Sequence, residues 1–421
     1  MCRPSRRAGE RTGESDPAAE AVGFECTREA HQISKGNPTV TDIAIIGGGH
    51  VGRTLLTDLV ATRGLHRMNP KLLFSQSNKA DIGKRIDEAS GTIRFEEVLS
   101  GATIDVEVGR DLFGSLDDVG ATETLTSAQM IFVTVPDIPS LRLEIFDKLA
   151  KIGSLKGKTI VLVKAGQASQ PVIANMINQG HPLADADIVL AESFYGTRAD
   201  RGSIIGNRKL SINIAILSRA ADQALERVRK CFPLGTEIDK PSWPDFNVVS
   251  AIDLLFVATA YFLHVAVVLH PRNLALTRAA VQYSHYLEGI DRELAQQLDA
   301  IDKERIALGC AYGLQLESFP QVLNRQYGLT VLPDFYEMMP SPKSIHALQQ
   351  SRHILEDVPA LYTIEWLMQR AGISMPETAA YIQQVNDVLP QIGVDRDALA
   401  AHRPLLAAIQ GGPSTLGPID I

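Results

Sequence analysis

The chain has 421 residues, more than one ordinary hydrophobic core accommodates, so we expect two domains. Its composition, with 45% hydrophobic and 21% charged residues, is that of a soluble globular protein. The net charge of −8 excludes proteins that bind nucleic acid through an overall basic surface, whereas small anionic substrates, which need only a few local arginines, stay open.

The first 38 residues predict a disordered leader, because they are rich in Arg, Glu, Ser and Gly and show little apolar periodicity. A secretory signal would need an apolar run after its basic start. A transit peptide would be poor in acids, but this segment contains Glu10, Glu14, Asp16 and Glu20. We therefore expect a cytoplasmic protein.

The cysteines and histidines give no sign of a metal site. The four cysteines are scattered without a Cys-x-x-Cys pair, and no histidines cluster at the spacing of metal ligands. The cysteines are Cys2, Cys26, Cys231 and Cys310. The pattern predicts neither a structural zinc nor a disulfide framework.

The first half of the folded chain alternates strand-like and helix-like runs. Residues 41–46 are a β-branched run that leads directly into a glycine-rich turn and a helical pattern. Further strand-like runs follow at residues 71–75, 130–136, 159–163 and 187–191. The alternation predicts a doubly wound, mostly parallel sheet of the Rossmann type over residues 39–242.

The turn after the first strand contains Gly47, Gly49 and Gly52 at the spacing of a dinucleotide site. The first glycine forms the turn, the second lets the backbone approach a pyrophosphate, and the third lets helix and strand pack closely. The helix N-terminus then offers free N–H groups to the phosphates. We predict that these glycines, His50 and Val51 bind a dinucleotide; a purely structural turn is the alternative.

The end of the second strand favours NADP(H). It reads Ser75-Gln76-Ser77-Asn78-Lys79, where a site for NAD usually has an acid on the ribose hydroxyls. Hydroxyls, amides and cations suit a 2′-phosphate, so Ser75, Ser77, Asn78 and Lys79 are predicted cofactor contacts, with NAD(H) as the alternative cofactor. The alternative is that Lys79, Lys84 and Arg85 are ordinary solvated charges on a helix surface.

The strand-like run at residues 130–136 adds Val135 and Pro136 to the predicted cofactor contacts.

After about Pro241 the pattern becomes almost entirely helical. Prolines and a tryptophan interrupt regular structure between residues 240 and 247, so we expect a helical substrate-binding domain over residues 243–421.

Residues 248–269 are apolar and long enough for a membrane span. They contain Asp253 and His264, their flanks have no basic cluster, and no second such segment exists in the sequence. These features favour a buried helix of the helical domain and a protein that does not enter a membrane.

Three polar residues beyond that stretch are candidates for catalysis. His270 precedes a proline, and a histidine exchanges protons near neutral pH. Asp357 could hold an imidazole in one tautomer, and Arg352 could bind a carboxylate through two parallel hydrogen bonds. Taken singly, a core histidine, a helix cap and a surface ion pair are the commoner roles, and His264 receives the core interpretation.

The chain resembles the opine dehydrogenases, the group that includes octopine, nopaline and N-(1-carboxyethyl)amino-acid dehydrogenases. The resemblance extends from residue 41 to about residue 390 and includes the glycine-rich turn and the His270-Pro271 pair. Its other motifs are Ala191-Glu192-Ser193-Phe194-Tyr195-Gly196-Thr197-Arg198, Tyr286-Leu287-Glu288-Gly289-Ile290, Asp302-Lys303-Glu304-Arg305 with Gly313, residues 352–359, and Ala371-Gly372-Ile373-Ser374-Met375-Pro376.

The resemblance implies that NAD(P)H reduces an imine formed from an amino acid or amine and an α-keto acid. It assigns catalysis to His270, the partner carboxylate to Asp357 and a substrate carboxylate to Arg352. The family usually has an aromatic residue after that arginine, whereas this chain has His353. The segment at residues 194–198 is similar to that of the staphylopine-type metallophore branch, which prefers NADPH. We also expect the protein to be a homodimer.

Two other functions stay open. One is a hydroxy-acid or 6-phosphogluconate-like dehydrogenase acting on C=O, although no lysine in the sequence stands in the context expected for those enzymes. The other is a nucleotide-sensing Rossmann protein without catalysis. The combination of His270, Arg352 and Asp357 argues against the second.

Overall fold

The computed structural model describes residues 41–66, 68–75, 82–200, 203–217, 221–232, 244–257, 260–328, 343–344, 348 and 351–408. The predicted leader lies outside this part of the chain, as do residues 240–243 of the predicted domain boundary. Ser77, Asn78 and Lys79 lie outside it as well.

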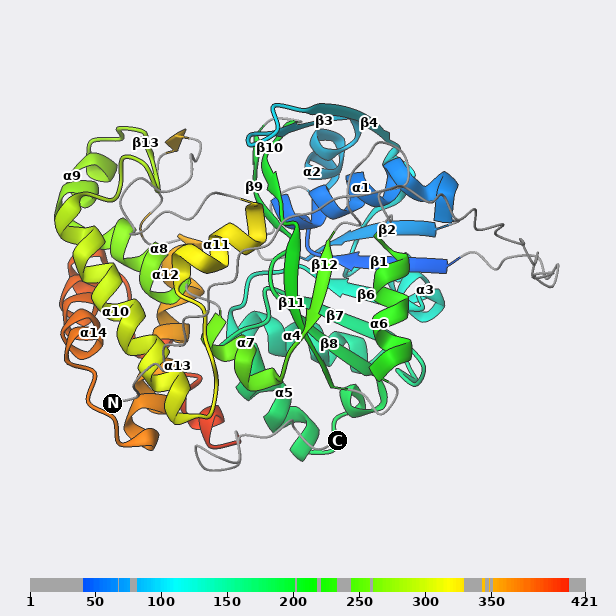
Figure 1. Ribbon diagram of the computed structural model, residues 1–421. Helices are drawn as coiled ribbons and strands as arrows, with labels where there is room; N and C mark the ends of the chain where they lie inside the picture. The colour runs from blue at the N-terminus through cyan, green and yellow to red at the C-terminus, as the bar shows by residue number, and fades with distance from the viewer. Residues whose placement is uncertain are drawn as a thin grey trace, which may run out of the picture. The chain divides into compact units, whose positions relative to one another are not determined.

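An eight-stranded sheet has the order β12-β11-β8-β7-β6-β1-β2-β5. Every pairing from β8 to β5 is parallel, and β11 runs antiparallel to β8. Strands β6 and β7, which lie side by side in Figure 1, are buried throughout, because a parallel sheet is covered on both faces. The strands are β1 Thr41–Ile46, β2 Met68–Phe74, β5 Phe113–Ser115, β6 Met130–Val133, β7 Thr159–Val163, β8 Asp187–Ala191, β11 Ser211–Leu217 and β12 Asp245–Val248.

Two apolar cores lie on opposite faces of this sheet. In β1, Ile43 and Ile45 point into one core while Ala44 and Ile46 point into the other, as the alternation of strand side chains requires. Helices α1 and α6 cover the first core, and α3, α4 and α5 cover the second. The helices are α1 His50–His66, α3 Val119–Ser127, α4 Pro139–Ala150, α5 Ser169–Asn178 and α6 Ala221–Lys230. The predicted doubly wound architecture is confirmed.

The strand order reverses direction between β1 and β6, because the chain proceeds from β1 to β2 on one side and later returns to β6 on the other. Ligands of open α/β sheets bind outside the carboxyl ends of the strands at such a point. Here those ends lead into Gly47 and Thr134.

A smaller four-stranded sheet has the order β4-β3-β10-β9, and side chains from β3, β4 and β10 share the apolar core that α1 covers. Its strands are β3 Gly91–Glu97, β4 Thr103–Val108, β9 Tyr195–Asp200 and β10 Ser203–Arg208. Helix α2 Ile82–Ala89 leads into β3.

The remaining chain is almost wholly helical and has its own core, as predicted. In Figure 1, helices α10, α13 and α14 gather around α8, and their side chains share one apolar cluster. The helices are α7 Ala251–Val257, α8 Ala260–Leu269, α9 Pro271–Arg278, α10 Arg292–Ala311, α11 Phe319–Tyr327, α12 Arg352–Leu355, α13 Asp357–Ala371, α14 Pro376–Val388 and α15 Arg396–Leu399. Strands β13 Tyr283–Ser284 and β14 Lys343–Ser344 form a short pair, and the 3-10 turns are η1 Arg110–Leu112, η2 Pro182–Asp185, η3 Pro390–Ile392 and η4 Arg403–Ala408.

Within the described residues, Ala251–Leu269 is the one stretch long and apolar enough to cross a membrane. However, 80% of it is buried inside the protein. A core helix of a soluble protein has this burial, which favours the core interpretation made from the sequence.

Candidate active site

The turn between β1 and α1 has the backbone of a dinucleotide-binding turn. Gly47 has a φ of 122°, and a Cβ there would lie 2.7 Å from Oγ1 of Thr134. A Cβ on Gly52 would lie 2.0 Å from the carbonyl oxygen of Gly47. A Cβ on Gly49, in contrast, would meet nothing within 4 Å. The turn is therefore closed toward the protein and open at its middle glycine, which suits the approach of a pyrophosphate.

Helix α1 begins at His50 and has no acidic residue in its first turn, so nothing there repels a phosphate. Burial is the main cause that lowers the pKa of His50 to about 3, and the positive charges of Arg352, Arg53 and Lys164 lower it further. The imidazole is therefore neutral, with Nδ1 3.3 Å from Oγ1 of Thr197. Of the remaining predicted cofactor contacts, Val51 is half-buried beside the core that α1 covers.

The carboxyl end of β6 lies against the same turn. The hydroxyl of Thr134 is 3.0 Å from the carbonyl oxygen of Ile46 and 3.1 Å from that of Gly47. A Cβ on Gly47 would also lie 2.9 Å from the backbone nitrogen of Val135. Val135 is buried and Pro136 is exposed. The structure therefore brings the end of β6 to the glycine turn, as the predicted cofactor contacts require.

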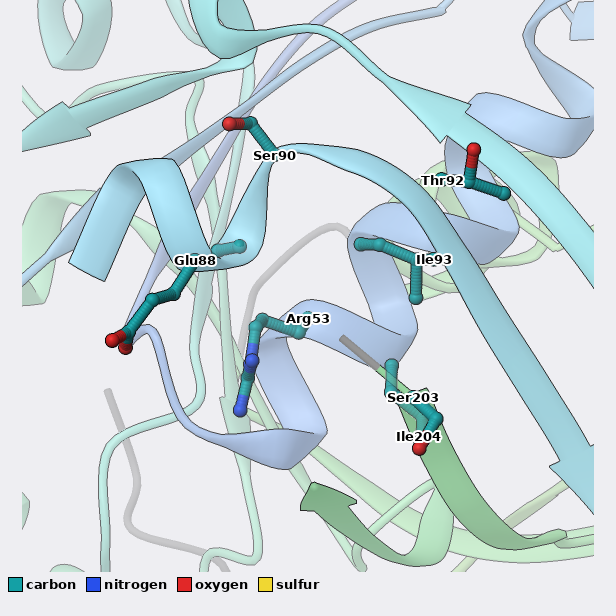
Figure 2. A pocket seen from close by; sticks show the side chains of 8 residues that line it. Arg53, Glu88, Ser90, Thr92, Ile93, Ser203 and Ile204 are labelled. Carbon is teal, nitrogen blue, oxygen red and sulfur yellow. The ribbon is translucent and has the colours of Figure 1, made fainter. Parts of the chain in front are cut away.

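A small pocket opens beside the first turn of α1 and contains a cation that the sequence prediction overlooked. Figure 2 shows Arg53 from α1, Glu88 from α2, Thr92 from β3 and Ser203 from β10 around it. The Nε atom of Arg53 is buried and has no hydrogen-bond partner among the described residues. Arg53 directly follows Gly52, which is the signal in the sequence that could have identified it.

Arg53 lies close to a second arginine. Burial lowers the pKa of Arg53, and the positive charge of Arg85 lowers it further, while Glu88 acts in the opposite direction. The guanidinium of Arg85 lies 5.0 Å from the ring centre of Phe74, the last residue of β2. Ser75 follows and is half-buried. Arg85 thus lies beside the end of β2, and its charge reaches Arg53.

The second group of polar residues surrounds Asp357, the first residue of α13, which is 2% exposed. Its Oδ2 lies 2.9 Å from Nδ1 of His264 in α8 and 3.7 Å from Nδ1 of His353 in α12. The opposite ring atom of His264, Nε2, lies 3.1 Å from the hydroxyl of Tyr286. A carboxylate, two imidazoles and a phenol therefore meet in one place.

The expected contact between His270 and Asp357 is corrected by this geometry. His270 precedes α9, and its Nε2 lies 3.9 Å from the carboxylate of Asp291. Six residues separate it from His264, which corresponds to roughly 9 Å of rise and a different face of a helix. Asp357 contacts His264, and the interpretation of His264 as an ordinary core histidine missed this carboxylate.

Lys164 also reaches Asp357. It directly follows β7, and its Nζ lies 3.2 Å from Oδ1 of Asp357 and 2.7 Å from Oε2 of Glu356. The statement that no lysine stands in a catalytic context is therefore wrong for the folded chain. The signal was a polar residue placed directly after a buried parallel strand, where α/β proteins place their ligand-binding residues.

The charges in this group determine its protonation. Burial raises the pKa of Asp357, but Lys164 and the contacts with His264 and His353 outweigh burial and hold it well below its ordinary value. Burial lowers the pKa of His264, although Asp357 partly opposes it. At neutral pH the carboxylate is ionised and His264 is neutral. Its Nδ1–H donates to Asp357, so Nε2 carries the lone pair.

Arg352 begins α12 and is exposed. Its positive charge lowers the pKa of His264 and His353, and also that of His50 in the glycine turn, in each case after the larger effect of burial. The charge of Arg352 therefore reaches both the glycine turn and the Asp357 group. A substrate that spans the two would meet it.

The ligand atoms of His264, His353 and Asp357 lie within 4.8 Å of one another, close enough to hold a metal ion. The sequence could not indicate this set, because its members come from three helices. The ammonium group of Lys164 already supplies positive charge to the same carboxylate, at 3.2 Å. The expectation of no metal stays a prediction.

Comparison with known proteins finds a family that matches the helical domain and solved structures that share the fold. Residues 248–389 match the family described as NAD/NADP octopine/nopaline dehydrogenase, alpha-helical domain. No curated protein matches the chain by sequence. Octopine dehydrogenase in complex with NADH and agmatine is 17% identical, with a TM-score of 0.60 over 86% of this chain and 92% of that chain.

Two further solved structures are similar to this chain. Octopine dehydrogenase with NADH and L-arginine is 16% identical, with a TM-score of 0.60 over 91% of this chain and 97% of that chain. A putative ketopantoate reductase from Ralstonia solanacearum is 14% identical, with a TM-score of 0.53 over 85% of this chain and all 100% of that chain. At these identities the likeness concerns the fold. The likeness to the octopine/nopaline dehydrogenase family is therefore one of the helical domain at residues 248–389, and the likeness over the rest of the chain is one of fold.

Proposed function

We propose that this protein is an NAD(P)H-dependent opine dehydrogenase that joins an amino acid or related amine to an α-keto acid. The main support is the contact between Nδ1 of His264 and Oδ2 of Asp357, at 2.9 Å, in a region that matches the helical domain of the octopine/nopaline dehydrogenases. The similar octopine dehydrogenase structures contain NADH with agmatine or L-arginine, which supports an amine as one substrate.

The overall reaction balances as two steps. The amine nitrogen and the keto carbon form a C=N bond with loss of water, and this imine is then reduced to a secondary amine. When bound, the dinucleotide supplies the two electrons and one hydrogen for that reduction. Gly47, Gly49 and Gly52 would hold it, because they form the open turn at the end of β1, together with Val135, which follows β6 and lies beside that turn.

The proton chemistry is assigned to His264 in place of His270. Asp357 fixes the tautomer of His264, so Nε2 is the atom that accepts or gives a proton at the reacting centre. Tyr286 donates to the same atom at 3.1 Å before substrate binds. Arg352 would hold a substrate carboxylate, because its planar group matches that ligand and it lies near both parts of the site.

NADP(H) is the proposed preferred cofactor. Arg85 at the end of β2 supports a 2′-phosphate, as do the nearby charge of Arg53 and the absence of an acid at Ser75. Ser77, Asn78 and Lys79 stay predicted contacts of the same phosphate. Membership of the metallophore branch, a cytoplasmic location and a homodimer also stay predictions.

A second function is favoured by Lys164: reduction of a keto acid directly to a hydroxy acid. This alternative requires a lysine at the centre of the site, which the sequence did not reveal. The ammonium group of Lys164 lies there, 3.2 Å from Asp357. The ammonium group is held by two carboxylates, however, and its pKa is raised, which makes it a weak acid near neutral pH. We therefore retain the opine dehydrogenase as the main proposal.

The experiment that decides is a product analysis. The full-length protein is incubated with NADPH and one α-keto acid from a set of pyruvate, glyoxylate and 2-oxoglutarate, with and without an amino acid. Oxidation of NADPH is expected only when both substrates are present, and mass spectrometry should find one new C–N bond. A hydroxy acid as the sole product, formed at the same rate without amine, would establish the second function.

A further inference from the structure

Lys164 has a backbone conformation that lysine rarely adopts. Its φ is 55°, in the left-handed region, and it is not a glycine. It is the first residue after β7, at the carboxyl edge of the sheet. Strained residues of this kind persist where the surrounding structure fixes them, and they are frequent at functional sites.

The ammonium group is held between two adjacent acids on the helical side of the site. It lies 2.7 Å from Glu356 and 3.2 Å from Asp357. The side chain of Lys164 is 25% exposed, whereas both carboxylates are only 3% exposed. Buried carboxylates need such a partner, because removing it leaves an uncompensated charge.

Glu356 is itself held by a residue in the connection between β6 and α4. Its Oε1 accepts a hydrogen bond from the backbone N–H of Asp137, at 2.8 Å. The side chain of Asp137 in turn contacts Ser169 and lies 3.7 Å from the buried guanidinium of Arg142. The hydrogen bond from Asp137 therefore holds Glu356 in place, and Glu356 fixes the position of the Lys164 ammonium group.

We propose that Lys164, anchored by Glu356, is a positioning residue that holds Oδ1 of Asp357 and thereby directs Oδ2 to Nδ1 of His264. The proposal rests on the proposed function, because it assigns Lys164 a task in the proton chemistry of His264. Lys164 does not itself transfer the proton. Its place explains why one carboxylate oxygen faces a cation and the other faces the imidazole.

The protonation of His264 reports the charge of Lys164 independently of activity, and kcat reports the positioning of Asp357. Groups from several elements face its ring: Asp357 from α13, His353 and Arg352 from α12, Lys164 after β7, and His285 and Tyr286 after β13. Among them, Lys164 disfavours the imidazolium by its positive charge. Lys164→Met is therefore expected to raise the pKa of His264.

The chain offers a matched control. Lys148 also contacts two carboxylates, Asp117 at 2.6 Å and Glu144 at 3.0 Å, and its side chain is 26% exposed. It lies in α4 and touches no residue of the proposed site. Lys148→Met removes the same number of ion pairs, although with more exposed carboxylates, and should leave the titration of His264 unchanged.

The test is a pH titration of the histidine ring nitrogens by NMR with the full-length, nitrogen-15-labelled protein, the signal of His264 being assigned with His264→Gln. The expected result is a higher pKa of His264 in Lys164→Met and the wild-type value in Lys148→Met. Steady-state kinetics should show a lower kcat for Lys164→Met with little change in the KM of NADPH. Lys164→Arg should recover part of the lost kcat.

Two outcomes overturn the proposal: an unchanged titration and kcat in Lys164→Met, or the same changes in Lys148→Met. If Lys164→Met does not fold, Glu356→Gln carries the test, because it releases the anchor and keeps both Lys164 and Asp357. An unchanged kcat and titration in Glu356→Gln overturns the proposal equally. If the titration shifts as expected but no amine-dependent reaction exists, the proposed function fails while the positioning role stands.

Discussion

The Nδ1 atom of His264 lies 2.9 Å from Oδ2 of Asp357, although 93 residues separate them in the sequence. This contact is the basis for proposing the proton chemistry for His264 in place of His270, six positions later. It also fixes which nitrogen of His264 is available, because the ionised carboxylate accepts the Nδ1–H. The predictions below follow from this arrangement.

His264→Ala should lose turnover by about 10²–10⁴-fold, the range for removal of a general acid–base group. Dinucleotide affinity should be nearly unchanged, since the contacts of His264 among the described residues are with Asp357, Tyr286, His285 and His353. Stopped-flow or steady-state kinetics measure the first quantity, and quenching of tryptophan fluorescence measures the second. His270→Ala is the control and should keep most of the turnover; the opposite pattern would return the role to His270.

Asp357→Asn should lower kcat less than His264→Ala does. The imidazole stays, but an amide that donates to Nδ1 favours the wrong tautomer. The variant also leaves the ammonium group of Lys164 with one carboxylate, so a loss of thermal stability is expected. Rates and melting temperatures measured on the same preparation separate the two effects. Normal kcat in a fully folded Asp357→Asn protein would contradict the role of the pair.

Arg352→Lys should raise the KM of the α-keto acid more than it lowers kcat. A point charge replaces a planar group that binds a carboxylate through two hydrogen bonds. Arg370→Lys is a suitable control, because Arg370 lies over the ring of Trp366 in α13. An equal KM in wild type and Arg352→Lys would show that Arg352 holds no carboxylate.

NADPH should bind more tightly than NADH, and Arg53→Ala should reduce that difference. Arg85 lies beside the end of β2, where the ribose of a bound dinucleotide would lie, and its charge reaches Arg53 in the first turn of α1. Calorimetric titration with 2′,5′-ADP and with 5′-ADP isolates the contribution of the 2′-phosphate. Equal dissociation constants for the two fragments in the wild-type protein would refute the NADP(H) preference.

Stability should fall on acidification between pH 6.5 and about 4, partly because of His402. Burial lowers the pKa of this histidine from 6.5 to about 4, and its Nε2 lies 3.1 Å from Oγ1 of Thr363. Below pH 6.5 the unfolded chain binds a proton that the folded protein does not, so the free energy of unfolding decreases until the folded pKa is reached.

The contribution of His402 amounts to about 3 kcal/mol at the acid end of this range, at 1.36 kcal/mol per pKa unit. His402→Gln should therefore lose less of its free energy of unfolding between pH 6.5 and 4 than the wild type does. Urea denaturation at a series of pH values measures the difference. Parallel curves for the two proteins would contradict the assignment.

The fold was predictable from the sequence because its signals are local. The β-branched run at residues 41–46, the glycine spacing and the change to helical periodicity after Pro241 each depend on neighbouring residues. The end of β6 at Val135 could also be placed beside the turn, since parallel strands end at one edge of a sheet.

The pairing within the site could not be derived in the same way. His264 and His270 are both near the end of one helical stretch, and the sequence does not specify which face of that stretch Asp357 contacts. Lys164 carries no motif, and its contact with Asp357 joins residues 193 positions apart. Such contacts depend on how α8 packs against α13 and on how the start of α13 meets the residue after β7, which periodicity does not determine.

The bridge between Lys164 and Glu356 also has a consequence for evolution. Each residue neutralises the other in a poorly solvated place, so a change at one position alone leaves a charge without its partner. The two positions are expected to covary, with a neutral residue at 164 accompanied by a neutral residue at 356. The order Glu356-Asp357 matters as well. Exchanging the two acids would preserve the composition and charge of the chain, yet it would shorten the side chain that reaches the sheet and lengthen the one that reaches the imidazole.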